Sequence, residues 1–323
     1  MLTRPFGRTG WMVSALTFGA WQLGGTWGAL EEGEGRDVLL SAIDGGVNLI
    51  DTAPAYGNGR SEEIVGRALA LRRGTDVRVA TKILPLARQT GPRAIDSICG
   101  QYPSDYVRVE VEGSLRRLGR DRIDLLQLHL WAEDGLENLD WLPTILDLQV
   151  QGKVGWIGVS LPDIQSNTGV ALARTQLVTS IQVMFNIFEQ SPQDQLFPSG
   201  LGTQTAFIAR VPFDSGSLTG TWTAMTRDRW AADDKRRQMY TTERMAETLA
   251  RVGAVREDIA GHYSDMSTAA LKFCLSDPAV STIACGMRSV AEVEANLAAL
   301  AAPPMPTKLA ARLSRHHWPH DFY

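Results

Sequence analysis

Short apolar runs rich in β-branched residues alternate along the whole chain with longer segments of helical periodicity. Between two of the runs, Val107, Val111, Leu115 and Leu118 recur at steps of four, four and three, so they share one helix face. The runs predicted as strands are Leu16–Trp21, Val47–Ala53, Val77–Lys82, Ile123–His129, Val154–Ser160, Ser180–Asn186, Thr205–Pro212 and Ser281–Gly286. Strands that alternate with helices indicate parallel pairing through right-handed crossovers.

Eight strand–helix units favour a closed barrel over a doubly wound open sheet. No G-x-G-x-x-G motif follows a predicted strand and no G-x-x-x-x-G-K-[ST] motif is present, so the nucleotide-binding loops typical of open sheets are missing. The strands are evenly spaced, and no linker rich in Pro, Gly or Ser divides the chain. We therefore predict an α/β fold of one domain, a (β/α)₈ TIM barrel that covers residues 1–323.

Three segments depart from the strand–helix rhythm. We expect residues 1–14 to form a hairpin that closes the barrel floor. Residues 213–242 follow the seventh strand, are rich in glycine and then charged, and lack a clear period. A connection this long at the C-terminal face of a barrel is typically functional or disordered, so we expect a cofactor-side loop. Residues 303–323 are expected to form a C-terminal tail that packs near the barrel.

The composition narrows the functional classes. Lys and Arg number 32 against 36 Asp and Glu, a net charge of −4, which disfavours nucleic acid or an anionic membrane as a partner. No run approaches the ~20 apolar residues that span a bilayer, and the first residues lack a secretory signal, so we expect a cytoplasmic protein. Cys99, Cys274 and Cys285 lack C-x-x-C spacing, and we expect each to be a small buried apolar residue.

Polar residues stand at the ends of three consecutive predicted strands. Asp51, Lys82 and His129 end the second, third and fourth strands, and Tyr56 follows in the loop after Asp51. Because the C-terminal strand ends of a barrel meet at one mouth, we expect the four side chains to converge there. Each alone is more often a helix cap or a rim charge, but their joint occurrence favours an active site.

A phenol, an ammonium and a carboxylate in one partly desolvated place are suited to giving a proton to a carbonyl. A free phenol has a pKa near 10, and we expect the Lys82 cation to lower the pKa of Tyr56 while Asp51 keeps Lys82 charged and oriented. His129 can hydrogen-bond the carbonyl oxygen. No side chain supplies a hydride, so reduction requires a cofactor. The same residues leave Schiff-base chemistry by Lys82 open.

Several collinear segments resemble the aldo-keto reductases. The hallmark segment is Asn48–Gly57 with Ser61–Gly66, and Ala80–Lys82, Asp124–His129 and Gly158–Ser160 follow in the order and spacing of that family. The resemblance implies a catalytic tetrad of the four residues named above. It also implies NADP(H)-dependent reduction of an aldehyde or ketone, with a small-molecule carbonyl as substrate.

The resemblance assigns three residues to the nicotinamide end of the cofactor. Ser160 and Gln182 match residues near the nicotinamide amide, although Leu161 stands where an Asn commonly follows the serine. Phe185 is matched to a tyrosine that stacks on the ring, a role that a phenyl group can also fill.

The phosphate and adenine end is implied in the same way. The loop that would wrap the pyrophosphate contains Pro212, Phe213, Gly216, Leu218 and Gly220, with a plain turn as the alternative for the two glycines. Gly286 precedes Arg288, which is matched to the 2′-phosphate of NADPH and stands beside a helix start, a favourable place for phosphate. Glu292 is matched to a position beside the adenine or, with Ser289, forms a capping box. Asn296 is matched to an adenine contact.

Two tryptophans and a histidine-rich tail complete the candidates. Trp21 and Trp131 are expected either to wall the substrate pocket or to cover the core. The cluster His316–His320 has no carboxylate or thiol in a defined spacing, so we expect tail packing and no metal site. Two other functions stay open: an NADP(H)-binding regulatory or sensor subunit with slow turnover, like the potassium-channel β subunits of this fold, and a Schiff-base lyase. The sequence sets no oligomeric state.

Overall fold

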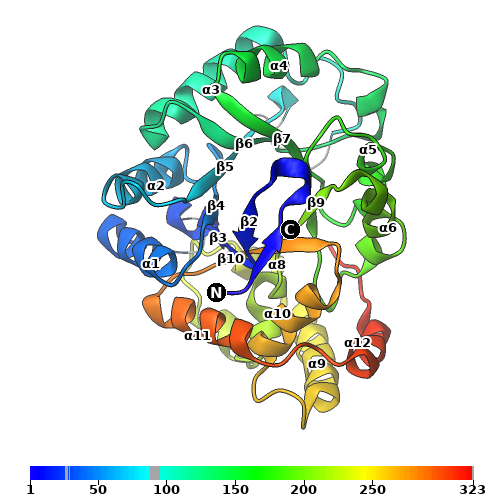
Figure 1. Ribbon diagram of the computed structural model, residues 1–323. Helices are drawn as coiled ribbons and strands as arrows, with labels where there is room; N and C mark the ends of the chain where they lie inside the picture. The colour runs from blue at the N-terminus through cyan, green and yellow to red at the C-terminus, as the bar shows by residue number, and fades with distance from the viewer. Residues whose placement is uncertain (26–27, 29, 88–94, 322–323) are drawn as a thin grey trace.

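Eight parallel strands close into a barrel in the computed structural model, which describes residues 1–25, 28, 30–87 and 95–321 (Figure 1). The order around the barrel is β10-β3-β4-β5-β6-β7-β8-β9. The strands are β3 (Leu16–Gly19), β4 (Leu49–Asp51), β5 (Arg78–Ile83), β6 (Ile123–Leu128), β7 (Val154–Ser160), β8 (Ser180–Met184), β9 (Ala206–Arg210) and β10 (Val280–Gly286). The predicted (β/α)₈ barrel and all eight of its strands are confirmed.

The predicted strands differ from the observed ones mainly at their ends. β7 has the predicted bounds, whereas β4 is shorter than the predicted Val47–Ala53 and β9 is shorter than Thr205–Pro212. Both strands lose residues at each end, because the apolar runs continue past the paired residues into the loops of the floor and of the mouth.

Side chains on each strand alternate between the barrel interior and the layer beneath the helices. Leu49, Ala80, Leu125 and Ile208 pack inside the barrel with Phe6, which comes from the N-terminal segment. That segment is an antiparallel hairpin of β1 (Thr3–Pro5) and β2 (Met12–Ser14), and it lies across the N-terminal end of the barrel in Figure 1. The interior is therefore apolar at the floor, and polar residues enter it only above this layer.

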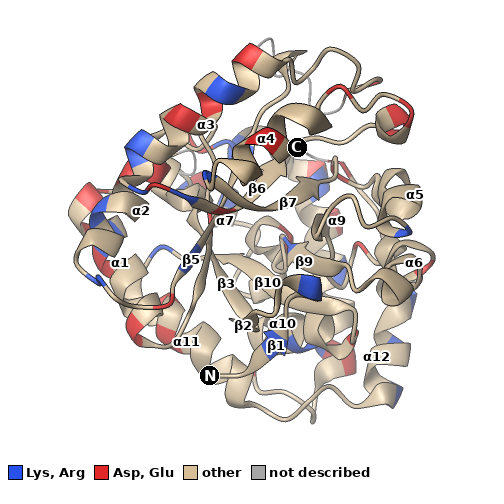
Figure 2. Cartoon of the chain, turned by 45° about the horizontal axis from the view of Figure 1, so that its top comes forward, with Lys and Arg blue, Asp and Glu red and all other residues tan. Residues whose placement is uncertain are grey.

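Helices surround the barrel and bury the outward faces of the strands. They are α1 (Glu32–Asp44), α2 (Arg60–Ala70), α3 (Ser104–Leu118), α4 (Leu142–Val150), α5 (Val170–Ala173), α6 (Leu196–Gly200), α7 (Thr226–Arg229), α8 (Arg236–Met239), α9 (Thr242–Ile259), α10 (Met266–Ser276), α11 (Val290–Ala301) and α12 (Thr307–Leu313). Charged residues gather on the outer faces of α1, α2 and α3 (Figure 2). Among the described residues, no helix is both long and apolar enough to cross a membrane.

The segment 213–242 has more structure than its lack of period suggests. It contains a 3₁₀ helix at Asp214–Thr219 and the short helices α7 and α8. Trp222 packs edge to face against both Trp230 and Tyr240, and the three rings form a cluster of their own with centroids 4.9–6.0 Å apart. Aromatic packing, which no short sequence period records, orders this connection.

The C-terminal tail is tied to the barrel by two histidine–carboxylate pairs. His316 Nε2 lies 2.7 Å from Asp258 Oδ2, and His320 Nε2 lies 3.1 Å from Asp214 Oδ1. The Trp318 N–H donates to the carbonyl of Phe188, in the loop after β8. The tail therefore packs at the C-terminal end of the barrel as far as Asp321, and residues 322–323 lie outside the described part of the chain.

Two of the three cysteines are buried as expected, and the prediction for the third is wrong. Cys274 and Cys285 are buried, and burial raises the pKa of both thiols, whereas Cys99 is exposed in the connection before α3.

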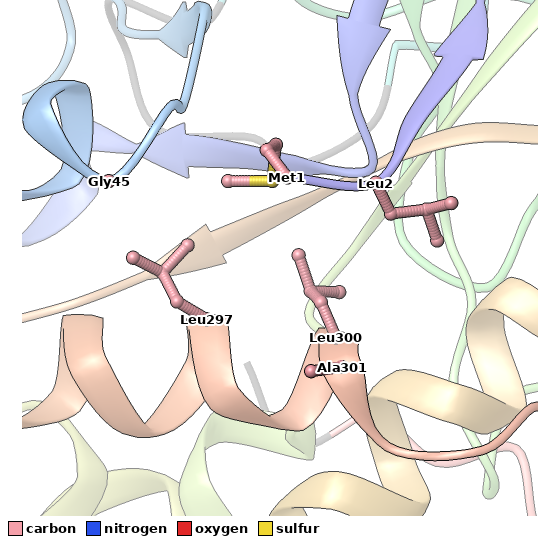
Figure 3. A pocket seen from close by; sticks show the side chains of 6 residues that line it. All are labelled: Met1, Leu2, Gly45, Leu297, Leu300 and Ala301. Atoms are coloured by element: carbon pink, nitrogen blue, oxygen red, sulfur yellow. The ribbon is translucent and has the colours of Figure 1, made fainter.

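A hollow of about 300 Å³ lies between the N-terminus and the end of α11, and Met1, Leu2, Gly45, Leu297, Leu300 and Ala301 line it (Figure 3). This hollow lies at the N-terminal end of the barrel, opposite the predicted site.

The His320–Asp214 pair predicts a pH-dependent stability. Burial opposes the charged imidazolium, but the hydrogen bond and charge of Asp214, with Glu189 nearby, outweigh it, so the pKa of His320 lies above its ordinary value of 6.5. The stabilisation is complete below the unfolded pKa and is lost as pH rises through the folded pKa. His320→Gln should therefore lower the free energy of unfolding by about 1.5–3 kcal/mol at pH 6 and by less at pH 9.

Denaturant titration at both pH values measures this difference, with the exposed His262→Gln as the matched control. An equal loss at both pH values would show that the imidazolium charge is not what holds the tail.

Candidate active site

Asp51 lies at the centre of the barrel mouth and accepts hydrogen bonds from three other strands. Its Oδ2 lies 2.7 Å from Lys82 Nζ on β5. Its Oδ1 accepts from Gln127 Nε2 on β6 at 3.0 Å and from Gln182 Nε2 on β8 at 2.9 Å. Since a buried carboxylate needs donors to replace water, this network fixes the position of Asp51 and joins opposite walls of the barrel.

Lys82 is fully buried and donates to three acceptors. Besides Asp51, its Nζ donates to the Thr52 carbonyl and to Tyr56 Oη, each at 2.9 Å. Burial disfavours the ammonium, but the charge of Asp51 and the bonds to Asp51 and Tyr56 outweigh this, and the pKa of Lys82 lies above its ordinary 10.5. Lys82 is therefore a charged ammonium at neutral pH.

Tyr56 is buried between Lys82 and two aromatic rings. Its ring is edge to face with Trp21 at 4.9 Å and with His129 at 6.0 Å. Burial raises the pKa of the Tyr56 phenol, and the Lys82 charge opposes this without reversing it. Lys82 lowers the Tyr56 pKa as expected, but burial has the larger effect, so the net shift of the pKa is upward. The structure nonetheless brings all four predicted tetrad residues together, with Tyr56 in its protonated form.

At the nicotinamide end, the strand alternation separates the three predicted residues. Ser160 ends β7 on the inward side, and Gln182 also points inward but is engaged with Asp51. Phe185 lies in the layer beneath the helices, with its ring 5.0 Å from Phe197 and 5.5 Å from Phe273. It is an odd number of residues from Gln182, so the two point to opposite faces. The structure does not bring Phe185 to the site.

Other residues of the mouth were not predicted. Gln127 belongs to the Asp51 network, and Gln22 lies directly against Gly286, where an added Cβ would come within 1.9 Å of its Nε2. Arg210 ends β9 and pairs with Asp163 in the loop after β7 at 2.6 Å. Counting alternate positions back from the strand ends would have found Gln127 and Arg210, because both share the inward side with residues of the floor.

The predicted pyrophosphate loop is a tight turn with backbone in the left-handed region. Asp214 and Ser215 have φ of 45° and 57°, and Gly216 and Gly220 have φ of 111° and 72°. The N–H groups of Gly216 and Leu218 both donate to the Phe213 carbonyl, and Gly220 N–H donates to Ser217. These N–H groups thus build the turn that follows Pro212, and the two glycines are required there by conformation.

The residues predicted at the adenine end cluster around the start of α11. Ser289 Oγ accepts from Glu292 N–H at 3.1 Å, and Glu292 Oε2 accepts from Arg288 N–H at 2.7 Å. Glu292 therefore caps the helix, which favours the second of its two interpretations. Arg288 follows Gly286 at this helix start, beside Gly28, while buried Asn296 donates to Cys285 Sγ at 3.5 Å.

The two tryptophans predicted for the substrate pocket occupy different places. Trp131 is buried against Trp141, with ring centroids 5.7 Å apart, and its Nε1 donates to the Thr168 carbonyl. It covers the core. Trp21 lies beside Tyr56, and its Nε1 and the Oε1 of Gln22 are buried atoms without a hydrogen-bond partner. Two unpartnered polar atoms at the mouth indicate a place for a ligand with both acceptors and donors.

A comparison with known proteins decides the family. The family model described as "Aldo/keto reductase family" matches residues 15–317.

The chain belongs to the aldo/keto reductase family.

It is 31% identical over 89% of its length to the aldo-keto reductase YhdN of Bacillus subtilis, of which 85% is covered. It is 27% identical to the NADH-specific methylglyoxal reductase of Escherichia coli, over 92% of each chain. The solved aldo-keto reductase AKR11C1 of Bacillus halodurans superposes with a TM-score of 0.78 at 24% identity, covering 99% of this chain and 97% of that one.

Membership establishes an oxidoreductase enzyme that reduces carbonyl groups, in a family that typically uses NAD(P)H. The residues present fit such a cofactor, since the mouth holds the unpartnered Trp21 and Gln22 atoms and a guanidinium stands at the start of α11. Within residues 1–25, 28, 30–87 and 95–321, no group of three or more His, Cys, Asp or Glu is placed to hold a metal ion.

Lys82→Met tests whether the buried pair is the structural centre of the mouth. Removing the ammonium leaves Asp51 as an uncompensated buried charge, so we expect a loss of about 3–5 kcal/mol in the free energy of unfolding. Adding Asp51→Asn removes the stranded charge but keeps an acceptor for Gln127 and Gln182, and should recover part of the loss. Denaturant midpoints measure both variants. Equal stability of Lys82→Met and the wild type would contradict the account.

Proposed function

We propose that this enzyme reduces an aldehyde or ketone to an alcohol with NADPH, and that Tyr56 delivers the proton. The observation that carries the proposal is the chain of hydrogen bonds from Asp51 through Lys82 to the Tyr56 hydroxyl. Bound NADPH would supply the hydride, which no side chain provides.

The roles of the four residues follow from their contacts. Tyr56 is the acid, since its raised pKa keeps it protonated at neutral pH. Lys82 donates to the Tyr56 oxygen and stabilises the phenolate that forms when the proton leaves. Asp51 keeps Lys82 charged and oriented toward the Tyr56 hydroxyl. His129, whose ring meets that of Tyr56, lies where an imidazole can donate to the carbonyl oxygen.

The Schiff-base alternative is disfavoured by the state of Lys82. A lysine that attacks a carbonyl must be a neutral amine with a free lone pair. Here all three N–H bonds have acceptors and the pKa is raised, so the amine form is rare at neutral pH. A regulatory, NADP(H)-sensing role would use the same pocket, and turnover measurements with a panel of carbonyls distinguish it.

The preference for NADPH is proposed from Arg288. Its guanidinium would meet the 2′-phosphate, the group that NADH lacks. A relative is named as NADH-specific, so the preference is a property to be tested in each chain. Here Asp234 also lies near Arg288: burial raises the Asp234 pKa, but its bonds to Arg236 and the Arg288 charge lower it overall.

Tyr56→Phe tests the proton donor. The substitution removes only the hydroxyl, so NADPH affinity should stay nearly unchanged while kcat falls by at least ~10²–10⁴. Single-turnover oxidation of NADPH by a reactive aldehyde, followed at a single pH, gives the rate. A variant that keeps most of the wild-type rate would exclude Tyr56 as the acid.

Arg288→Ala tests the cofactor choice. Loss of a charge-assisted hydrogen bond should weaken NADPH binding roughly ten- to a hundredfold and leave NADH binding little changed. Dissociation constants for both cofactors come from quenching of tryptophan fluorescence at fixed salt, with exposed Arg73→Ala as control. Equal losses for the two cofactors would mean that Arg288 does not recognise the phosphate.

A further inference from the structure

Arg210 places a second cation inside the barrel mouth. Along β9, Ile208 packs with the interior floor, whereas Phe207 and Ala209 face the helices. Alternation therefore directs Arg210 inward, one layer above Ile208. Its Cα partners are Met184 on β8 and Ala284 on β10, so it stands at the height where those strands end.

The guanidinium is held from the loop after β7. One of its nitrogens, Nη2, lies 2.6 Å from Asp163 Oδ1 and donates to the Leu161 carbonyl at 3.0 Å. The side chain thus reaches from β9 across the end of β8 to the residue that follows Ser160. It is 18% exposed, so its guanidinium borders the open part of the mouth.

The charge of Arg210 affects the pKa of Tyr56, the proposed acid. Burial raises the pKa of the Tyr56 phenol, and Arg210 is among the charges that oppose this, with Lys82. Phe185, predicted to stack on the nicotinamide ring, faces the helices instead. Arg210 lies next to this place, since its guanidinium donates to the carbonyl of Leu161, the residue after Ser160.

We propose that Arg210 forms the wall of the site beside the nicotinamide ring, and that the Arg210–Asp163 pair sets the balance between binding of the oxidised and the reduced cofactor. This inference rests on the proposed function, which places the ring near Ser160. A guanidinium is planar and can lie against a flat ring. The oxidised nicotinamide ring carries a positive charge and the reduced ring carries none.

The sign of the effect follows from Coulomb's law. The Arg210 cation disfavours the oxidised ring and leaves the reduced ring nearly unaffected, while the Asp163 carboxylate does the reverse. The two charges partly cancel in the intact pair. Removing one charge leaves the other uncompensated. Substitutions on the two sides of the same ion pair should therefore shift the balance between oxidised and reduced cofactor in opposite directions.

The experiment compares dissociation constants of NADP⁺ and NADPH for Arg210→Met, Asp163→Asn and the wild type, by quenching of tryptophan fluorescence at low, fixed salt. Met keeps the length of the side chain without its charge. The ratio of the NADP⁺ constant to the NADPH constant should fall at least ~3-fold in Arg210→Met and rise by a similar factor in Asp163→Asn. The double variant should lie between them.

Arg256→Met is the matched control, because the Arg256 guanidinium also donates to a backbone carbonyl, that of Gly220 at the far end of the cofactor loop. It should change both constants by the same factor. If the wild type binds neither form, the proposed function fails. If it binds both and the ratio is the same in Arg210→Met, Asp163→Asn and the wild type, or if both variants shift it in one direction, the inference is overturned while the proposed function stands.

Discussion

The buried ion pair of Asp51 and Lys82 is the constraint on which the mouth of this barrel depends. Two charges removed from water are stable only when their remaining donors and acceptors are satisfied. Gln127 and Gln182 complete the carboxylate, and the Thr52 carbonyl and the Tyr56 hydroxyl complete the ammonium. The pair and these partners come from four strands, β4, β5, β6 and β8, and from the loop after β4, so satisfying the pair also positions Tyr56, the proposed acid.

The barrel makes this arrangement possible because alternate residues of each strand point into the interior and toward the helices. The floor is closed by Phe6 and apolar strand residues, which exclude water from below. One layer higher, Asp51, Lys82 and Gln127 meet inside the same ring of strands, whereas the residues that alternate with them pack under the helices. The low dielectric that makes the pair costly to bury also strengthens the hydrogen bond from Lys82 to the Tyr56 hydroxyl.

Much of the fold was predictable because it depends on local patterns. Strand positions follow from apolar runs, and the tetrad follows from polar residues at consecutive strand ends. The predictions that failed did so for physical reasons. Phe185 is matched to the nicotinamide ring by sequence alone, although it is an odd number of residues from Gln182 and therefore faces the helices. The net pKa of Tyr56 depends on burial, and the order within 213–242 depends on Trp222, Trp230 and Tyr240 meeting in space. Neither is encoded in spacing.

The central claim is that Lys82 is a permanently charged ammonium bound to Asp51 and Tyr56. The chain has five lysines, so selective ¹⁵N labelling of lysine gives a simple set of side-chain signals whose shifts report protonation. We expect the Lys82 signal to stay in the ammonium range when pH passes 10.5, where exposed lysines are half deprotonated, whereas Lys272, whose pKa burial lowers, titrates earlier. A Lys82 signal that titrates below 10.5 would contradict the claim.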